Sequence, residues 1–479
     1  MKPSQFDDVI DQIVDQIQTL YRPQSLGKPR RLGSGQLNNL RASISTLIRA
    51  SLPLIVGRTE THRYASIHKR SNYYSDGKRY EPSQTYVVHV TNAYEGMIWL
   101  GYLKEEKKGV SEKAKGKYLT RYSATKKLLK LFGDMDVELL PVLMPSRQLE
   151  EPLIVKVKRE LEDENGNKIK ISEQVYYDDT PVTLTMRDNL KRINDNLSKH
   201  WIDIALDDEE IHQVRRHLAK TKTDKNDIPE TLNLGKRCLH RSFLNTRFNS
   251  GGRFYGGWWQ IIPKLFRSHI VIDGKKTIEL DFSGLHPSLL YGIVDSPLPE
   301  DPYDIGIHRD HRDHRDIVKR AFNAMLNAAK PLKRAPKGLK IRQTGLQWRE
   351  LSHRLLRLHT PINIFFHQEV GNRLQFIDSL IAERIMLRFI NEKAGAVVLP
   401  VHDSFIVHHG YEYELRNMMI QEFEKLFGQE IGLGKLAQKY FPLSDRPNEE
   451  WQSMEFESIV GQNDMGWINR TEWHLNHTY

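Results

Sequence analysis

The chain has 479 residues, with 71 Lys and Arg against 61 Asp and Glu, which gives a formal net charge of +10 and a pI near 9.3. This excess of positive charge favours a polyanionic partner such as nucleic acid. The single cysteine, Cys238, excludes an internal disulfide and a cysteine-rich zinc or iron–sulfur site, so we expect the cytoplasm or another reducing intracellular compartment.

The first residues predict an amphipathic helix and no targeting sequence. The start MKPSQFDDVIDQ has acidic and polar residues where a signal peptide has a basic stretch and then an apolar run. Apolar residues recur at helical spacing over residues 5–21. Because no window approaches the roughly 18 apolar residues of a membrane span, we expect neither secretion nor a membrane partner.

Residues 1–180 are expected to form a basic α+β domain whose role the sequence leaves open. Short β-rich runs predict strands over 85–90, 97–103, 153–157 and 168–177. The segment from Lys104 to Lys130 carries ten Lys and Arg against three Glu. That excess suits either a solvated surface or contact with a nucleic-acid backbone.

The middle of the chain predicts a helical stretch and then a loop. Apolar residues are roughly in helical step over 186–220, and the polar segment 220–229 is typical of a linker. From about residue 235 to the end we expect a mixed α/β domain. No repeat of 20 to 50 residues is present, which excludes a solenoid.

Two aspartates each lie at the end of a predicted strand. An apolar strand runs into Asp281, and the chain then turns toward an apolar helix that begins near Pro287. Farther on, two β-branched runs flank His402-Asp403, which predicts a hairpin with Asp403 at its tip. Each aspartate taken alone is explained better by a turn or a helix cap. Side by side, the two carboxylates would hold two Mg²⁺ ions for phosphoryl transfer.

A predicted helix between these aspartates carries two cations on one face. Arg315 and Lys319 are four residues apart, with Phe322 and Leu326 continuing the apolar stripe beside them. Together they are able to clamp a triphosphate. A second basic segment suits a template-strand phosphate track or a solvated loop; its basic residues are Lys330, Lys333, Arg334, Lys337, Lys340, Arg342 and Arg349.

Four ordered segments resemble the palm and fingers of family A DNA polymerases and their relatives, the phage-type single-subunit RNA polymerases. The segments are Gly252-Arg253-Phe254 with Gln260-Ile-Ile-Pro263, Asp281-Phe-Ser, Arg315-x3-Lys319 and Val401-His402-Asp403. The first is similar to the family's Thr-Gly-Arg and Gln-Asn-Ile-Pro, and the others resemble its motifs A, B and C. A fifth, weaker match is Gln375 within the segment 373–378.

The resemblance implies a role for each matched residue. Asp281, Asp403 and the backbone carbonyl of Phe282 are expected to bind the metal ions. Arg315 and Lys319 are expected to bind the triphosphate, with Lys319 as general acid for pyrophosphate. The residues expected to hold the primer–template terminus are Arg253, Gln260, Gln375 and His402.

Some positions depart from the family pattern. Five residues after Asp281, where the DNA polymerases have Glu, the chain has His286, whose ring favours deoxynucleotides by sterics. Eight residues after Lys319 an aromatic residue is replaced by Asn327, which puts a polar group near the sugar of the nucleotide. The 122-residue spacing of the two aspartates is short for the family and predicts compact fingers.

We therefore expect an α/β (α+β) right-hand polymerase with palm, compact fingers and thumb. Its expected parts are an N-terminal domain over 1–180, a thumb-like helical region over 181–250 and a palm with fingers over 251–479. The expected activity is template-directed DNA synthesis with two Mg²⁺ ions or Mn²⁺, acting on primer–template DNA and nucleoside triphosphates. Two alternatives stay open: a single-subunit RNA polymerase or primase, and a non-catalytic nucleic-acid-binding protein on a polymerase scaffold.

Overall fold

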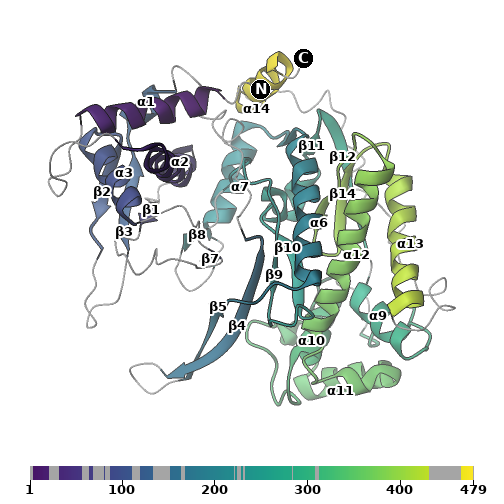
Figure 1. The fold of residues 1–479 in the computed structure, drawn as a ribbon. Coiled ribbons are helices and arrows are strands. Elements are labelled where there is room, and N and C mark those ends of the chain that lie inside the picture. Colours follow the sequence, from purple (N-terminus) through teal and green to yellow (C-terminus); the bar gives the residue numbers. More distant parts are fainter. Residues whose placement is uncertain are drawn as a thin grey trace.

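The computed structural model is a mixed α/β fold, as the sequence predicts (Figure 1). Among the described residues no helix has both the length and the apolar character to cross a membrane. The structure describes residues 4–20, 32–56, 64–67, 80, 87–109, 119–132, 151–162, 168–220, 222–223, 228–229, 232–282, 284–307, 312–430 and 465–477.

The N-terminal elements enclose a hydrophobic core of their own. Its members lie between Phe6 and Phe132, and the core of the remaining chain lies between Leu153 and Phe423. Helix α1 (Ser4–Leu20) confirms the helix predicted over 5–21. It packs with α2 (Ser34–Val56), α3 (Val87–Trp99), α4 (Lys126–Lys130) and a three-stranded antiparallel sheet in the order β1 (Ala65–Ile67), β3 (Thr120–Ala124), β2 (Leu103–Lys107).

The strands predicted over 85–90 and 97–103 are wrong where the structure describes them. Residues 87–99 form the helix α3, and β2 begins only at Leu103. The β-branched Val87, Val88 and Val90 resemble a strand. The buried positions Val90, Ala93, Tyr94 and Met97, however, follow the helical spacing of i, i+3, i+4 and i+7.

A long two-stranded ribbon extends from the larger body. The strands predicted over 153–157 and 168–177 are confirmed as β4 (Leu153–Glu162) and β5 (Lys168–Gln174), which pair antiparallel. They belong to a four-stranded sheet in the order β10 (Gly251–Tyr255), β9 (His240–Phe243), β4, β5.

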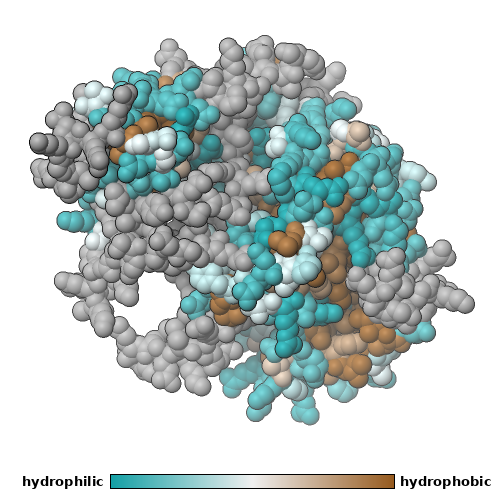
Figure 2. Space-filling model, in the orientation of Figure 1, coloured by the Kyte–Doolittle hydropathy of each residue, from teal (hydrophilic) through white to brown (hydrophobic). Residues whose placement is uncertain are grey.

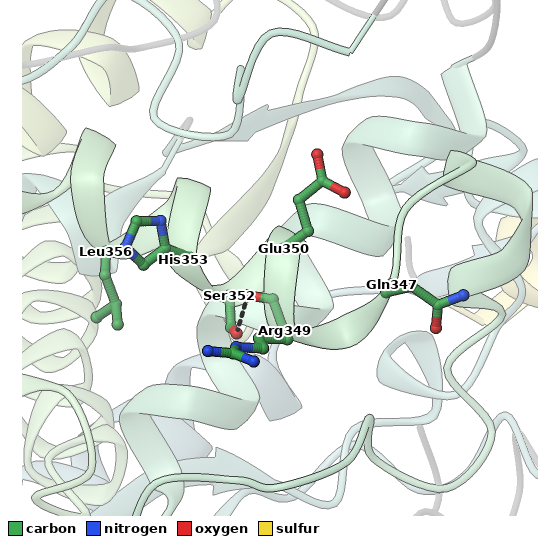
Figure 3. Close-up of a pocket in the computed structure, with 6 residues that line it drawn as sticks. All are labelled: Gln347, Arg349, Glu350, Ser352, His353 and Leu356. Carbon is green, nitrogen blue, oxygen red and sulfur yellow. Dashed lines mark hydrogen bonds between the residues drawn. The ribbon is translucent and has the colours of Figure 1, made fainter.

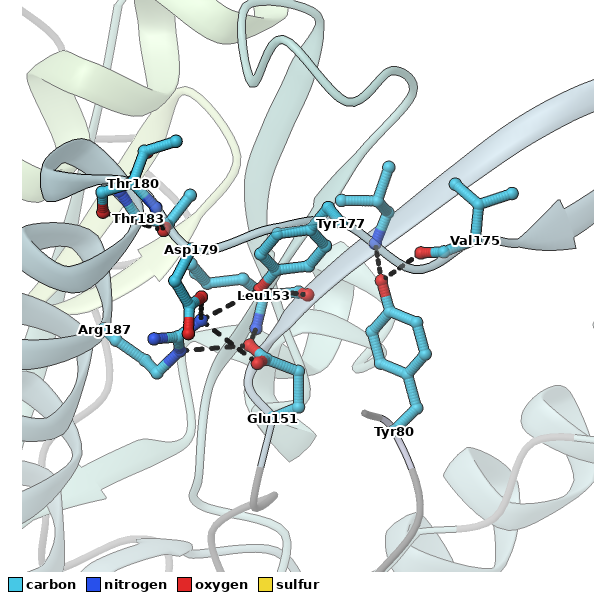
Figure 4. A network of polar contacts seen from close by, with 10 residues as sticks. Tyr80, Glu151, Leu153, Val175, Tyr177, Asp179, Thr180, Thr183 and Arg187 are labelled. Carbon is cyan, nitrogen blue, oxygen red and sulfur yellow. Dashed lines mark hydrogen bonds and ion pairs between the residues drawn. The ribbon is translucent and has the colours of Figure 1, made fainter. Parts of the chain in front are cut away.

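A polar network fastens the base of this ribbon to helix α6 (Pro181–Ser198) (Figure 4). The Tyr80 hydroxyl accepts from the backbone N–H of Val155 at 2.9 Å and donates to the carbonyl of Val175 at 2.8 Å. Arg187 on α6 pairs with Asp179 at 2.6 Å and with Glu151 at 3.2 Å. The ribbon base and α6 therefore hold each other in place.

A five-stranded antiparallel sheet forms the centre of the larger body. Its order is β13 (Leu399–Val401), β14 (Ser404–His408), β12 (Lys275–Asp281), β11 (Ile270–Ile272), β6 (Ile202–Ile204). Helix α13 (Glu412–Glu430) packs on β12 and β14 and contacts α12 (Gly371–Glu392), which in turn contacts α6, α9 (Leu285–Ile293) and β10. At the β6 edge, α14 (Met465–His477) docks through a buried ion pair between Arg470 and Asp203 at 2.9 Å.

The helix predicted over 186–220 is interrupted. It consists of α6 and α7 (Asp208–Lys220), with β6 between them, because residues 202–204 join the central sheet opposite β11. The segment predicted as a linker over 220–229 contains a short antiparallel pair, β7 (Lys222–Thr223) with β8 (Ile228–Pro229).

The remaining helical elements of the larger body include α10 (Arg312–Asn327), which contacts α11 (Trp348–Leu358), α12 and η4 (Ile341–Thr344). The face drawn in Figure 2 is mainly hydrophilic, with hydrophobic patches on the larger body. The other helical elements are α8 (Lys264–Arg267) and, like η4, the 3₁₀ turns η3 (Trp258–Gln260) and η5 (Thr360–Phe365).

Candidate active site

Sheet register brings Asp281 and Asp403 together. Asp281, the last residue of β12, lies directly opposite Ser404, the first residue of β14. The backbone N–H of Phe282 donates to the carbonyl of Asp403 at 3.3 Å. The two aspartates therefore occupy the same end of neighbouring strands, although 121 residues lie between them in sequence.

The hairpin predicted around Asp403 is present. Val401 pairs with Ser404, so that His402 and Asp403 form a two-residue loop between β13 and β14. His402 has a φ of 60°, a conformation that two-residue hairpin loops require at one or both positions and that histidine adopts more readily than most residues. The loop is thus built to present Asp403 at the end of the sheet.

The two carboxylates repel each other. Asp281 is exposed at the end of β12, but neighbouring protein groups partly desolvate its carboxyl group. This partial burial, followed by the negative charges of Asp403 and Glu279, raises the pKa of Asp281 to about 7. Lys319 and Lys264 act in the opposite direction. The site therefore holds negative charge that the described side chains only partly compensate.

Glu279 is a third carboxylate at this site, and the sequence analysis gave it no role. Its Oε1 accepts from Arg267 at 2.8 Å and from the Ser404 hydroxyl, while its Oε2 is buried without a hydrogen-bond partner. The signal for it was available, because residues two apart on a strand share one face of the sheet.

Helix α10 presents Lys319 to the carboxylates. Its positive charge partly offsets the upward shift in the pKa of Asp281, so Lys319 lies within electrostatic reach of that carboxylate. Arg315, one turn earlier on α10, forms an ion pair with Asp301 at 3.0 Å and lies over the ring of Tyr303 at 4.9 Å. The two cations thus share one helix, as predicted, but Arg315 is engaged by protein groups.

Arg253 and His286 converge on an aspartate that the sequence analysis left without a role. The Arg253 guanidinium donates two hydrogen bonds to the buried carboxylate of Asp378 on α12, and Nε2 of His286 lies 3.4 Å from the same oxygen. Burial lowers the pKa of Arg253, but the charge of Asp378 outweighs it and the net shift is upward.

Gly252 lets strand β10 lie close against α12. Its φ is +83°, and a Cβ there would lie 2.7 Å from the Phe243 ring and 3.1 Å from the Ser379 hydroxyl. The fully buried Arg241 fastens the same contact by donating to Gly252 O at 2.8 Å and to Glu383 at 2.9 Å. Arg253 is therefore held on a rigid support.

His402 adjoins Asp403 in the hairpin loop and interacts electrostatically with both Asp403 and Arg253. Its ring meets Tyr255 edge-on at 5.9 Å, and its Nδ1 is buried without a hydrogen-bond partner. Burial and the positive charge of Arg253 lower the pKa of His402. The ring is therefore neutral at physiological pH and keeps a free polar atom inside the site.

Three predicted site residues lie outside this cluster of contacts. The amide of Gln260 donates to the carbonyls of Phe254 and Pro400, both at 3.0 Å, and so connects η3 to two strands. Gln375 is half-buried on α12, one turn before Asp378. Asn327 is exposed at the end of α10 and donates to the carbonyl of Asn323 at 2.8 Å. Their predicted contacts with substrate stay predictions.

The residues at the strand ends fit a hard divalent cation. Asp281 and Asp403 supply the carboxylate oxygens that Mg²⁺ prefers, and a cation would offset the repulsion that raises the pKa of Asp281. Within the described part of the chain, no group of three His, Cys, Asp or Glu side chains is arranged to hold a metal.

A separate open hollow of about 610 Å³ lies along α11 (Figure 3). It is lined by Gln347, Arg349, Glu350, Ser352, His353 and Leu356. Arg349 of the predicted basic segment lines it, but none of the residues predicted to bind metal, nucleotide or the primer–template terminus does, and we assign it no catalytic role.

Comparison with known proteins identifies no family. No family model matches the chain, and no curated protein matches it. A solved structure that is similar to part of the chain is the POL domain of Pol1 from M. smegmatis, in complex with DNA primer-template and dNTP. The similarity covers 45% of this chain and 47% of that chain, with 12% identity and a TM-score of 0.25. At this level of similarity, nothing about the activity of this chain follows from the match.

Proposed function

We propose that the protein is a template-directed nucleotidyltransferase, a DNA polymerase of the family A type that extends a primer 3′-OH with deoxynucleoside triphosphates. One observation carries the proposal: Asp281 and Asp403 meet at the ends of two paired strands, within electrostatic reach of Lys319 on α10. Paired strand-borne carboxylates opposite a cationic helix are the arrangement that phosphoryl transfer requires.

In this proposal the central sheet is the palm, and α10 with the segment that leads to α11 forms compact fingers. Residues 181–250 would supply the thumb and residues 1–180 a separate N-terminal domain. The independent hydrophobic core between Phe6 and Phe132 supports the separation of that domain.

In this proposal the acidic side chains bind metal and the basic side chains of α10 bind the triphosphate. Asp281 and Asp403, with the backbone carbonyl of Phe282, would hold Mg²⁺, which when bound lowers the pKa of the primer hydroxyl and neutralises phosphate charge. Lys319 and Arg315 bind the triphosphate, and Lys319 donates a proton to the departing pyrophosphate. Arg315 must exchange Asp301 for phosphate oxygens, since its Nε now donates to that carboxylate.

His286 would face the sugar of the incoming nucleotide. His286 is the second residue of α9. The carboxylate of Asp378 orients its ring, because an oxygen of Asp378 lies 3.4 Å from Nε2 of His286. A ring held in this way excludes a ribose 2′-hydroxyl by sterics. Arg253 and His402 would contact the primer–template terminus beside it.

A second candidate is a single-subunit RNA polymerase or primase. It is favoured by Ser404-Phe405 after the aspartate, which resembles the RNA polymerase form, and by the polar Asn327 where DNA polymerases have an aromatic residue. The same two aspartates would serve either activity, so the difference lies in nucleotide and primer use.

The test is primer extension by the full chain. A labelled DNA primer on a DNA template is incubated with Mg²⁺ and with either deoxynucleotides or ribonucleotides, beside Asp281→Asn and Asp403→Asn. We expect extension with deoxynucleotides that is lost in both variants and in EDTA. Mn²⁺ is expected to replace Mg²⁺.

The matched control is Asp295→Asn. Asp295 is an exposed aspartate with a φ of 52°, a conformation that asparagine also adopts, so its replacement should leave extension unchanged. Extension with ribonucleotides alone would move the assignment to the RNA polymerase. Extension by neither pool, with primed DNA bound equally by all proteins, would leave the non-catalytic alternative.

A further inference from the structure

The segment between α10 and α11 is a purely basic surface. From Ala321 to Arg349 the chain contains no Asp or Glu. Over 330–349 it carries seven cations, and all seven side chains are exposed. They are Lys330, Lys333, Arg334, Lys337, Lys340, Arg342 and Arg349. We call this set the basic surface.

None of these seven side chains has an ion-pair partner among the described residues. Neighbouring arginines on the flanking helices are paired: Arg315 with Asp301 and Arg354 with Glu350, at 3.0 and 2.7 Å. The basic surface therefore carries charge that no described carboxylate compensates, whereas Arg315 and Arg354 beside it are compensated. Like charges this close repel one another, and a polyanion would relieve that repulsion.

The basic surface is supported by packed backbone. Apolar side chains alternate with the cations and pack against the main core; they are Leu332, Ala335, Leu339, Ile341 and Leu346. The indole N–H of Trp348 donates to the carbonyl of Leu332 at 2.7 Å and so ties the start of the segment to α11. Turns at Gly338 and Gly345, with φ of +83° and +70°, shape it without strain.

The segment is attached directly to α10. His314 Nε2 contacts the carbonyl of Gln343 at 2.6 Å, and Arg320 donates to the carbonyl of Gly338 at 3.5 Å. Helix α10 carries Arg315 and Lys319, which bind the incoming triphosphate in the proposed function. The basic surface is therefore fixed to the helix that carries the proposed triphosphate-binding residues.

We propose that the basic surface binds the phosphate backbone of the unpaired 5′ template strand ahead of the site. The identity of the bound strand rests on the proposed function. The charge of the basic surface, the exposure of its side chains and the packing of its backbone do not depend on that function. Recognition would be independent of sequence, because Lys and Arg contact phosphates and no aromatic side chain of 330–349 is exposed for stacking.

The test is the binding of two DNA probes in EDTA, where no extension takes place. One probe is a primer–template with roughly 10 unpaired template nucleotides at its 5′ side, a length within the usual single-strand site size. The other is a blunt duplex of equal paired length. Affinities are measured by fluorescence anisotropy over a series of salt concentrations for the full chain.

The variant is Lys330→Gln/Lys333→Gln/Lys337→Gln. We expect it to bind the overhang probe about 10-fold or more weakly, and the slope of log K against log salt to fall by about 2, at roughly 0.7 per lost single-strand phosphate contact. Binding of the blunt duplex should stay within about 2-fold. Because these lysines are exposed and unpaired, circular dichroism should be unchanged.

The matched control is Lys199→Gln/Lys220→Gln/Lys275→Gln, which removes the same charge from exposed lysines elsewhere. Equal weakening in both triple variants would overturn the inference, since net charge alone would explain it. The inference would also be overturned if Lys330→Gln/Lys333→Gln/Lys337→Gln bound both probes equally more weakly, or if it bound both as tightly as wild type. If the wild-type chain shows overhang-dependent binding and yet extends no primer, the proposed function fails while the surface stands as a nucleic-acid site.

Discussion

Asp281 shows how the site is poised for a cation. Its pKa is about 7 because of partial burial and the neighbouring charges of Asp403 and Glu279. A carboxylate whose pKa is raised in the folded state destabilises that state once the pH exceeds its unfolded value of 3.8, and the loss grows until the folded pKa is passed. Without metal, the ionised Asp281 therefore lowers the free energy of unfolding at neutral pH. A cation bound at the site would remove this loss of stability.

The first prediction follows from the upward direction of this pKa shift. In EDTA near pH 8, Asp281→Asn should melt at a higher temperature than wild type, because the variant removes the repulsion. Near pH 2.5, well below the unfolded value of 3.8, the wild-type carboxyl is protonated in both states and the difference should vanish. Differential scanning fluorimetry across pH measures this, with Asp295→Asn as the control that should not change. A lower melting temperature for Asp281→Asn at pH 8 would contradict the account.

The second prediction concerns the ion pair of Arg253 with Asp378. Asp378 is 1% exposed, so Asp378→Asn leaves a buried guanidinium without its counter-charge and should lower the free energy of unfolding by about 3 kcal/mol. The double variant Arg253→Met/Asp378→Asn should lose less than the sum of the two single variants, with a coupling of about 0.5–3 kcal/mol. Urea unfolding measures all four proteins, and strict additivity would show that the pair does not interact.

At the scale of elements, capping and register decide where the functional side chains lie. Thr180 caps α6 reciprocally with Thr183, and the same helix packs on α12, which carries Asp378. Sequence patterns predicted α1, the ribbon strands, the strand into Asp281 and the hairpin at Asp403, because each has a clear local period or turn. They failed at α3, whose β-branched start disguised a helical period, and at β6, which only tertiary pairing with β11 makes a strand.

The third prediction tests the α6 cap. Thr180→Ala removes the hydrogen bond that the backbone N–H of Thr183 donates to the Thr180 hydroxyl oxygen at 3.2 Å, and it should cost about 1 kcal/mol of unfolding free energy. Thr185→Ala on the same helix is the control. That side chain is exposed and bonds only back to Pro181, so alanine there should be neutral or slightly stabilising. An equal loss in both variants would count against the capping interpretation.

At the scale of the whole molecule, the described residues form two large hydrophobic cores and a small third cluster. The larger body brings together site residues from β10, β12, α9, α10, α12 and the β13–β14 loop. The sequence identified Asp281, Asp403 and Lys319 because they stand beside recognisable strands and a helix. It left Glu279, Asp378 and Tyr303 without roles. These residues contact the site through side chains that are far apart in sequence, and a local sequence pattern does not predict such contacts.

The fourth prediction addresses the two cores. Ile44 in the N-terminal core and Ile385 in the main core are both fully buried, so replacing either by alanine should cost about 2–5 kcal/mol in its own core. Scanning calorimetry should resolve two unfolding transitions. We expect Ile44→Ala to lower only one of them and Ile385→Ala only the other. A single transition that both variants lower equally would show one cooperative unit.

The central claim is that Asp281 and Asp403 act as one unit in nucleotidyl transfer. The most direct measurement is the rate constant for adding a single deoxynucleotide to a primed template in Mg²⁺, by rapid quench, for wild type, both single Asp→Asn variants and the double variant. We predict a fall of about 10³-fold or more in each single variant and little further loss in the double variant, since residues that act together are not additive. Retention of the wild-type rate in either single variant, with the protein folded, would contradict the account.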